Sequence, residues 1–266
     1  MKHQGAWLSW ATAASLSAVL TTNPFYLVLI AGAAIAIELV AEPPLAKRRG
    51  FRIFAIAGLG AMALRTLLVV FQPVTSSSVV AAVLEGARLA VMLIVFGTFN
   101  AVSDPFRVVR IVPRRFHEPA LAAALALSIA PRTIDAVGRV REAQRMRGIE
   151  IKPWRALPAL AVPVLETGME EAMTLAESMD ARGHGRGPRS RYRPDRWDSR
   201  AVLVACASAT GLGVFVAYTW WGRGDLLVST FPLEWPSVAG QLIVAALLLC
   251  APAVVLMTRF DGVGPR

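Results

Sequence analysis

The sequence predicts an all-α, polytopic membrane protein with about six transmembrane helices and two long helices on the cytoplasmic side. Composition is the first observation: 55% of the 266 residues are hydrophobic and 17% are charged, whereas soluble chains carry about 25% charged residues. The second is that the apolar residues form long runs. Two of these, Ala201–Trp221 and Val238–Thr258, contain no Asp, Glu, Lys, Arg or His. Runs of about 18 or more such residues are typical of membrane-spanning helices.

Residues 1–103 are expected to contain about four of these spans. The first two, Ala6–Leu20 and Pro24–Val40, are joined by a short turn and form a helical hairpin, of which the first span is the shorter. The next two are Ile53–Phe71 and Val79–Val102. Residues 201–266 are expected to add a C-terminal transmembrane hairpin made of the two uncharged runs.

Residues 104–200 form the polar part of the chain. Eighteen of the 28 Lys and Arg residues and twelve of the 18 Asp and Glu residues fall within it. Basic residues accumulate in loops on the cytoplasmic side of a membrane. We therefore expect residues 104–200 and both chain termini to be cytoplasmic, and the protein to cross the plasma membrane several times. This charge distribution indicates a protein that lies in a lipid bilayer and does not bind nucleic acid.

Two charged residues fall at similar depth inside neighbouring spans. Arg65 lies six residues from the outer end of the third span, and Glu85 lies six residues from the outer end of the fourth. A charge at membrane depth is costly and usually pairs with another charge. One hypothesis is that Arg65 and Glu85 form an intramembrane ion pair. The alternative is that Arg65 extends to the outer lipid headgroups.

Residues 104–200 also contain two apolar stretches, Pro119–Pro131 and Leu157–Leu165. Each is too short to span a membrane, and the prolines of the second are expected to disrupt it as a regular helix. A charged helical pattern follows in each case, from Thr133 to Gly148 and from Val164 to Gly183. The segment is therefore expected to supply the two long cytoplasmic helices.

Both charged helices end in the same dipeptide, Arg147-Gly148 and Arg182-Gly183, 35 residues apart. Glycine commonly follows the last helical turn because it accepts a positive φ without a Cβ clash. An arginine beside it lies at the partially negative end of the helix dipole, a gain of ~0.3–1 kcal/mol. These effects explain one such ending. Its repetition within one cytoplasmic segment favours a further role, because a guanidinium at a helix end can make bidentate contacts with a carboxylate of a partner.

The segment Asp104–Gly185 resembles the cytoplasmic region of the transmembrane T component of energy-coupling factor (ECF) transporters, the EcfT/CbiQ family. That family carries two Ala-x-x-x-Arg-Gly-like signatures at the ends of its coupling helices. The residues that match them here are Ala143, Arg147 and Gly148 in the first helix and Ala181, Arg182 and Gly183 in the second. Ser103-Asp104-Pro105 and Ala130-Pro131 also fit, whereas His184 stands where members commonly have an aromatic residue.

The resemblance implies a scaffold that is not itself an enzyme and needs no cofactor or metal. In that family two cytoplasmic ABC-type ATPases dock on the two arginines, and a small substrate-binding membrane protein, the S component, lies beside the T component. ATP-driven closure of the ATPases moves the coupling helices and reorients the S component, which brings in a vitamin or a transition-metal ion. The sequence agrees with this division of labour, because it contains no phosphate-binding loop of the form G-x-x-x-x-G-K-[ST].

Two other interpretations stay open. One is a self-sufficient membrane carrier or channel, in which Arg65, Glu85 and Arg88 line a polar path. The other is a membrane enzyme with its active site at the cytoplasmic face, although charged residues on helices are more simply solvated. Its candidate acids are Asp104, Asp135, Glu142 and Glu166.

Overall fold

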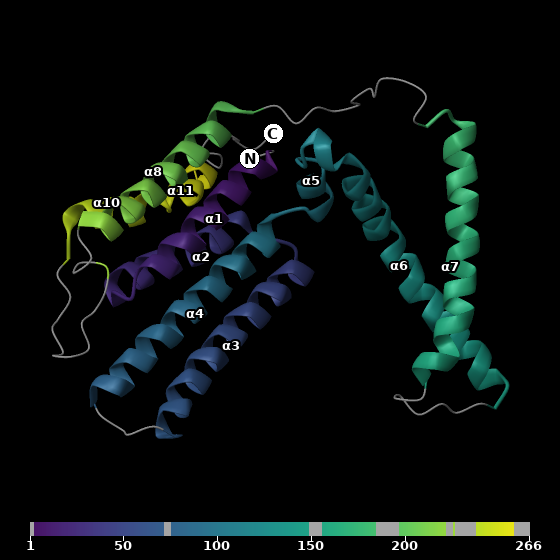
Figure 1. Cartoon of the computed structure of the whole chain (residues 1–266), viewed down its shortest axis with the longest axis horizontal. Coiled ribbons are helices and arrows are strands. Elements are labelled where there is room, and N and C mark those ends of the chain that lie inside the picture. The colour runs from purple at the N-terminus through teal and green to yellow at the C-terminus, as the bar shows by residue number, and fades with distance from the viewer. Residues whose placement is uncertain are drawn as a thin grey trace, which may run out of the picture. The chain divides into compact units, whose positions relative to one another are not determined.

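The computed structural model describes residues 3–71, 76–148, 156–184, 197–221, 226 and 238–257. These residues form α-helices with short 3-10 turns, and no strand occurs among them, which confirms the all-α prediction. The chain divides into two compact units (Figure 1). Unit 1 comprises Met1–Ile111 and Asp195–Arg266, and unit 2 comprises Val112–Pro194.

Unit 1 is a bundle of apolar helices. Its elements are α1 (Gln4–Leu20), α2 (Pro24–Ala41), α3 (Leu45–Leu67), η1 (Leu68–Phe71), α4 (Ser76–Val102), α5 (Pro105–Val109), α8 (Ser199–Trp221), α10 (Gly240–Leu248) and α11 (Ala251–Met257). Helix α1 packs against α2, α4 and α8, and α2 also contacts α10 and α11. Trp10, Tyr26 and Phe215 are fully buried in the core. The rings of Tyr26 and Phe215 meet edge to face with centroids 6.0 Å apart, an arrangement that aromatic pairs prefer.

The turn predicted between the first two spans is present. Asn23 is the N-cap of α2, and its side-chain oxygen accepts a hydrogen bond of 3.1 Å from the backbone N–H of Phe25. Pro24 follows at the first helical position, where its missing N–H costs nothing. The Asn-Pro pair therefore ends one helix and begins the next, as a helical hairpin requires.

Helices α3 and α4 pack closely because glycines remove side chains from their contact. A Cβ added at Gly86 would lie 2.9 Å from the Cα of Met62, and one added at Gly58 would lie 3.1 Å from the Cα of Ala90. Gly58 is the one buried residue of α3. The rest of this helix, including Ile53 and Ile56, is half-buried or exposed and apolar for most of its length.

Five helices among the described residues are long and apolar enough to cross a membrane, and a bent pair would make a sixth. They are α2, α3, α4, α6 (His117–Met146) and α8, with α10 and α11 bent by 48° as the pair. The number agrees with the prediction of about six, but the set differs. Helix α1 has 17 residues and falls short of this test, whereas α6 passes it.

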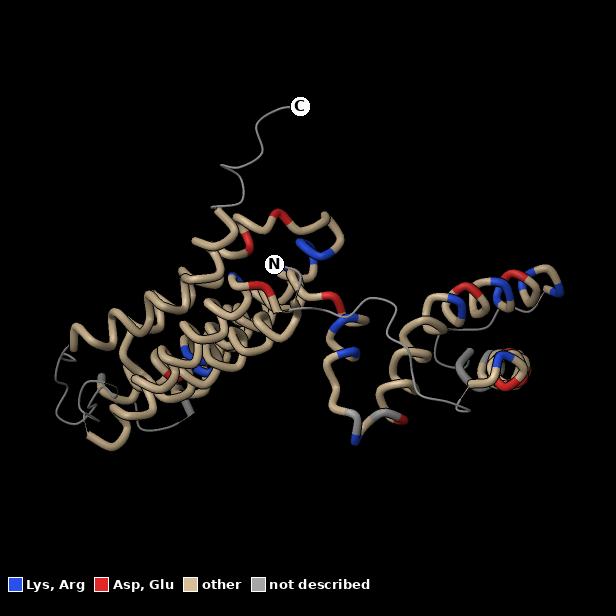
Figure 2. The backbone as a smooth tube through the Cα atoms, turned by 90° about the horizontal axis from the view of Figure 1, so that it is seen from above, with Lys and Arg blue, Asp and Glu red and all other residues tan. Residues whose placement is uncertain are grey.

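Unit 2 consists of η2 (Arg114–Phe116), α6 (His117–Met146) and α7 (Ala156–Ala181). Helices α6 and α7 run in opposite directions and cross, so their C-terminal ends lie at opposite ends of the unit (Figure 1). Charged residues gather in the second half of α6 (Figure 2). Helix α7 carries Glu166, Glu170, Glu171, Glu177 and Asp180, whereas α2 carries Glu38 alone and α1 carries no Asp, Glu, Lys or Arg.

Two expectations for this region were wrong. Pro163 lies inside α7, so the stretch Leu157–Leu165 is not disrupted as a helix. Pro131 lies inside α6, so the stretch Pro119–Pro131 continues into the charged helix that follows it. As a result α6 has 30 residues, and the stretch Pro119–Pro131 belongs to a helix that is long enough to span a membrane. A proline removes one hydrogen bond from a helix, a finite cost that a helix of this length can absorb.

Candidate functional site

The first candidate residues lie at the end of α6, and Arg147 and Gly148 are here called the α6 tip. Arg147 is the C-cap residue, and its backbone N–H donates to the carbonyls of Ala143 and Gln144 at 3.3 and 3.1 Å. Gly148 follows with φ of 72°, and its N–H donates to the carbonyl of Arg145 at 3.0 Å. A left-handed glycine after the last turn is what stops this helix.

The end of α7 repeats this geometry, and Arg182 and Gly183 are here called the α7 tip. Gly183 has φ of 74°, and its N–H donates to the carbonyl of Asp180 at 2.8 Å. The N–H of His184 donates to the carbonyl of Met179 at 3.0 Å. These two bonds are the pair that defines a Schellman motif, which satisfies the last carbonyls of a helix. His184, which stands where EcfT/CbiQ members commonly have an aromatic residue, therefore still takes part in the bonds that end α7.

Both tip arginines are exposed. Within the described part of the chain, neither Arg147 nor Arg182 forms an ion pair. Ala143 is half-buried and Ala181 is exposed. The two guanidinium groups are thus presented to the surroundings from the ends of two long helices, at opposite ends of unit 2 (Figure 1).

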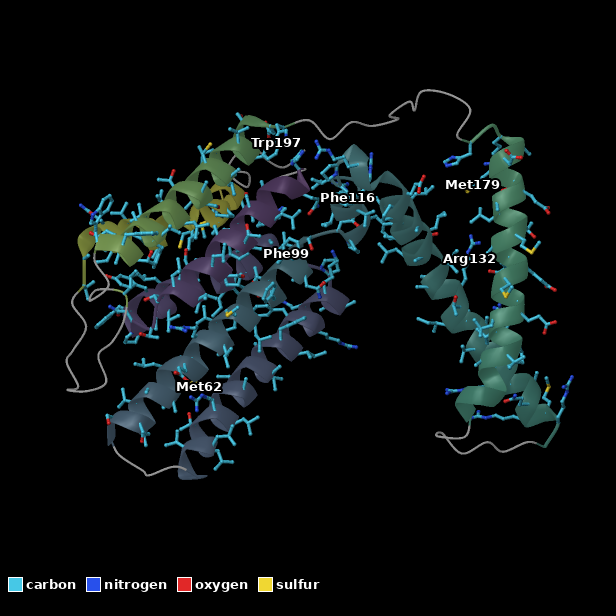
Figure 3. The ribbon with its side chains drawn as sticks, in the orientation of Figure 1. Met62, Phe99, Phe116, Arg132, Met179 and Trp197 are labelled. Carbon is cyan, nitrogen blue, oxygen red and sulfur yellow. The ribbon has the colours of Figure 1, made fainter. Side chains whose placement is uncertain are left out.

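An apolar groove of about 350 Å³ runs between α6 and α7 and reaches the α7 tip. Leu125 and Ile129 line it from α6, and Leu175 and Met179 line it from the last turns of α7. In Figure 3, Met179 points from α7 toward the side on which α6 lies. His184, the residue after the α7 tip, completes the lining. The second tip is therefore bordered by apolar surface.

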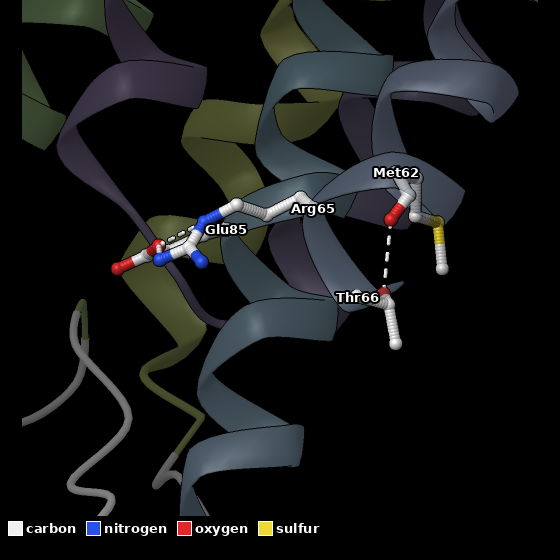
Figure 4. Close-up of polar contacts among 4 residues, drawn as sticks. All are labelled: Met62, Arg65, Thr66 and Glu85. Atoms are coloured by element: carbon white, nitrogen blue, oxygen red, sulfur yellow. Dashed lines mark hydrogen bonds and ion pairs between the residues drawn. The ribbon is translucent and has the colours of Figure 1, made fainter. Parts of the chain in front are cut away.

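The two charges expected inside neighbouring spans face each other in the structure. The Nε of Arg65 in α3 donates to Oε2 of Glu85 in α4 at 3.0 Å, and a second guanidinium nitrogen contacts the same oxygen (Figure 4). The two side chains are 36% and 48% exposed. The close approach of the two helices at Gly86 brings them together.

Arg88 lies one turn further along α4, and its Nε donates to the backbone carbonyl of Thr21 at 3.2 Å. Of the candidate acids, Asp104 is the N-cap of α5, where it accepts from the N–H of Phe106 at 3.1 Å. The other three, Asp135, Glu142 and Glu166, are exposed. Among the described residues, no three His, Cys, Asp or Glu side chains are arranged to hold a metal ion.

No protein-family model matches the chain. It is similar to proteins named energy-coupling factor transporter transmembrane protein EcfT, with 33% identity over 116 residues in Exiguobacterium sibiricum, 33% over 118 in Listeria innocua and 29% over 124 in Streptococcus thermophilus. The resemblance to EcfT is confirmed. The matches cover 41%, 41% and 44% of the chain and 43%, 43% and 47% of these relatives, so each spans less than half of the relative. Together with its apolar helices, the similarity to EcfT makes this chain a multi-pass membrane protein.

Three charged residues that the sequence did not single out as site residues make specific contacts in the structure. Arg48 pairs with Glu38, and Lys47 donates to the carbonyl of Ser103. One signal was available in the sequence, because Glu38 is the one charged residue in the apolar run Pro24–Val40 and a basic cluster follows about ten residues later. The contact of Lys47 with a backbone carbonyl has no comparable signal.

Proposed function

We propose that this chain is the transmembrane T component of an ECF-type ABC importer. In this proposal it holds two cytoplasmic ABC-type ATPases and transmits their ATP-driven motion to a substrate-binding membrane subunit, the S component. The observation that carries the proposal is the pair of exposed Arg-Gly helix ends at opposite ends of unit 2. The similarity to EcfT supports it over part of the chain.

The arrangement of the tips suits two partners. Because α6 and α7 cross and point in opposite directions (Figure 1), the α6 tip and the α7 tip are separated by most of the length of the unit. Each arginine is held at a capped helix end, so its backbone is already ordered before binding. An exposed guanidinium on a rigid support can form a bidentate pair with a carboxylate in a groove of each ATPase.

The rest of the proposal concerns the sides of the membrane and the cargo. The bundle of unit 1 would lie in the plasma membrane, and both chain termini, α7 and the charged second half of α6 would lie in the cytoplasm, where the ATPases are. In this proposal the apolar first half of α6, although the helix is long enough to span, would lie at the membrane interface. The S component would bind the cargo, a vitamin or a transition-metal ion. The chain itself would catalyse no reaction, since hydrolysis of ATP belongs to the ATPases.

A self-sufficient carrier is less well supported. Arg65 and Glu85 bind each other and Arg88 binds a backbone carbonyl, so the three side chains that were expected to line a polar path are engaged within the bundle. A carrier of this kind predicts solute flux into liposomes that contain only this chain. The T component predicts flux only when the ATPases and the S component are also present.

The test reverses the charge at both tips. The doubly substituted chain, Arg147→Glu with Arg182→Glu, is expressed with an affinity tag in its native host, and the ABC-type ATPases that co-purify are measured. Loss of one partner of an interfacial charge pair costs ~2–5 kcal/mol, so we expect the single changes to weaken capture and the double change to abolish it. Arg145→Glu is the control, because Arg145 is also exposed in the last turn of α6 but precedes the tip. Undiminished capture by the double variant would show that the tips are not the docking sites.

A further inference from the structure

The first observation concerns the place where the chain leaves the apolar bundle. Helix α4 ends at Val102, and α5 begins at Pro105 with Asp104 as its N-cap. Ser103 lies between them and is 5% exposed. The Nζ of Lys47, in the first turn of α3, donates to the carbonyl oxygen of Ser103 at 2.6 Å. A side chain from the first turn of α3 therefore contacts the backbone of the α4–α5 junction.

The carbonyl oxygen of Ser103 needs a hydrogen-bond donor from outside α4 and α5. The Ser103 N–H completes α4 by donating to Phe99 at 2.8 Å. The first turn of α5 uses the next carbonyl, that of Asp104, which accepts from the N–H groups of Arg107 and Val108, and Pro105 has no N–H to donate. A buried carbonyl without a partner is costly. The Lys47 ammonium supplies the partner and also lies at the negative end of the α4 dipole.

The neighbouring residue ties the same turn to α2. The Nε of Arg48 donates to Oε1 of Glu38 at 3.2 Å, and Glu38 is 4% exposed in the last turn of α2. A buried carboxylate without a partner is unfavourable, so this pair fixes the start of α3 against the end of α2. Lys47 and Arg48 thus connect one turn of α3 to two different places, the end of α2 and the α4–α5 junction.

Backbone packing makes this connection stiff. A Cβ added at Gly97 of α4 would lie 2.8 Å from the Cβ of Phe54 in α3, and one added at Gly50 would lie 3.7 Å from the side chain of Asn100. The beginning of α3 and the end of α4 are therefore in close contact. Close contacts of this kind leave little freedom for one helix to slide past the other.

We propose that Glu38, Lys47, Arg48 and Ser103 form a clamp, in which Lys47 is a positioning residue that holds the α4–α5 junction rigidly to the bundle. Unit 2 begins at Val112, a few residues beyond this junction. If unit 2 is moved by ATPases, as in the proposed function on which this inference rests, a rigid junction carries the motion into the bundle. A loose junction absorbs the motion by bending.

The clamp itself is tested by amide hydrogen exchange on the full chain in lipid nanodiscs. Lys47→Met removes the donor and keeps an unbranched apolar side chain one atom shorter, whereas Lys47→Arg keeps a donor. Arg49→Met removes one positive charge from an exposed neighbour. We expect exchange of the amides from Ser103 to Val109 to become about tenfold faster in Lys47→Met, as the loss of a charge-assisted hydrogen bond predicts. Lys47→Arg and Arg49→Met should stay near wild type. Equal exchange in Lys47→Met and Arg49→Met would overturn the clamp.

Its role in coupling is tested in the complex with the two ATPases. The difference in exchange of α3 and α4 amides between the ATP-bound and ADP-bound complexes is compared for wild type, Lys47→Met and Arg49→Met. Lys47→Met should capture both ATPases normally but lose most of this nucleotide-dependent difference. If the difference is retained, the clamp does not transmit motion. If instead the proposed function is wrong, the result is a different one: reversal of the charges at Arg147 and Arg182 would leave capture of the ATPases intact.

Discussion

The indole Nε1 of Trp10 donates a hydrogen bond of 2.8 Å to the backbone carbonyl of Leu249, 239 residues later in the chain. This carbonyl lies at the break between α10 and α11, which are bent by 48°. The N–H groups of Ala253 and Val254 both donate to Cys250, so the helix does not supply Leu249 with the donor four residues ahead. Trp10 takes its place, and α1 thereby stabilises the bend of the last span.

Replacing Trp10 with Phe should therefore destabilise the protein, because it removes the hydrogen-bond donor at the break between α10 and α11. The substitution leaves a buried carbonyl without a donor, which costs ~1–3 kcal/mol, in addition to the loss of volume. Trp7→Phe is the matched control, since Trp7 is also buried in α1 and loses the same atoms. Thermal unfolding in detergent should show a lower midpoint for Trp10→Phe than for Trp7→Phe. Equal midpoints would mean that the bond to Leu249 contributes little.

Replacing glycine with alanine should destabilise α6 and α7 at their tips but stabilise them at positions inside the same helices. Gly183→Ala places a Cβ at φ of 74°, which costs ~1–2 kcal/mol, and should fray the last turn of α7. Gly168→Ala lies inside α7, where an added Cβ meets nothing within 4 Å, and should stabilise the helix by ~0.5–1 kcal/mol. Gly148→Ala and Gly138→Ala form the same pair in α6. Exchange of the His184 amide, which donates to Met179, measures the fraying in α7; no change in Gly183→Ala would contradict the Schellman assignment.

The α3–α4 contact should tolerate no side chain at Gly86. Gly86→Ala would place a Cβ 2.9 Å from the Cα of Met62, and separating the two backbones should cost ~1–3 kcal/mol. Gly60→Ala serves as the control on the other helix, because a Cβ there meets nothing within 4 Å. The measurement is the unfolding midpoint of each variant in detergent. Similar midpoints for the two substitutions would show that the helices can move apart at little cost.

The Arg65–Glu85 pair is expected to show coupling in a double-mutant cycle. Arg65→Met and Glu85→Gln each leave one charge without its partner inside the bundle, whereas the double variant leaves none. Polar side-chain pairs between transmembrane helices contribute about 0.6 kcal/mol on average and at most about 1.7 kcal/mol in such cycles, so the coupling should be about 0.5–1.5 kcal/mol. The free energy of unfolding and the efficiency of membrane insertion are measured for all four proteins. Strictly additive effects would indicate that the two charges act independently.

Features that depend on local chemistry were predictable from the sequence. The turn at Asn23-Pro24 follows from an N-cap and a proline that starts a helix, and the ends of α6 and α7 follow from glycines that accept positive φ. The similar depth of Arg65 and Glu85 in adjacent spans suggested a pair as one of two hypotheses, and the structure has the two side chains in contact. Each of these features is set by residues close together in the chain or by the simple geometry of a hairpin.

The prolines show where such reasoning fails. Pro163 was expected to disrupt the stretch Leu157–Leu165 as a regular helix, and it lies inside the continuous helix α7. The stretch Pro119–Pro131 was expected to be too short to span a membrane, but α6 continues through Pro131. The rule for proline describes a local cost of ~3 kcal/mol. Whether a helix continues through that cost depends on the hydrogen bonds and packing on both sides of it, which a local rule does not count.

The sequence by itself determined that this chain crosses a membrane several times and that two of its helices end in Arg-Gly, because hydrophobic length and glycine conformation are properties of short segments. The tertiary structure decided that the two tips lie at opposite ends of unit 2 (Figure 1), that Trp10 binds Leu249 and that Lys47 binds Ser103. These contacts join residues far apart in sequence, and backbone carbonyls accept hydrogen bonds whatever their side chains are. Only the packing of the helices selects which carbonyl a distant donor can reach.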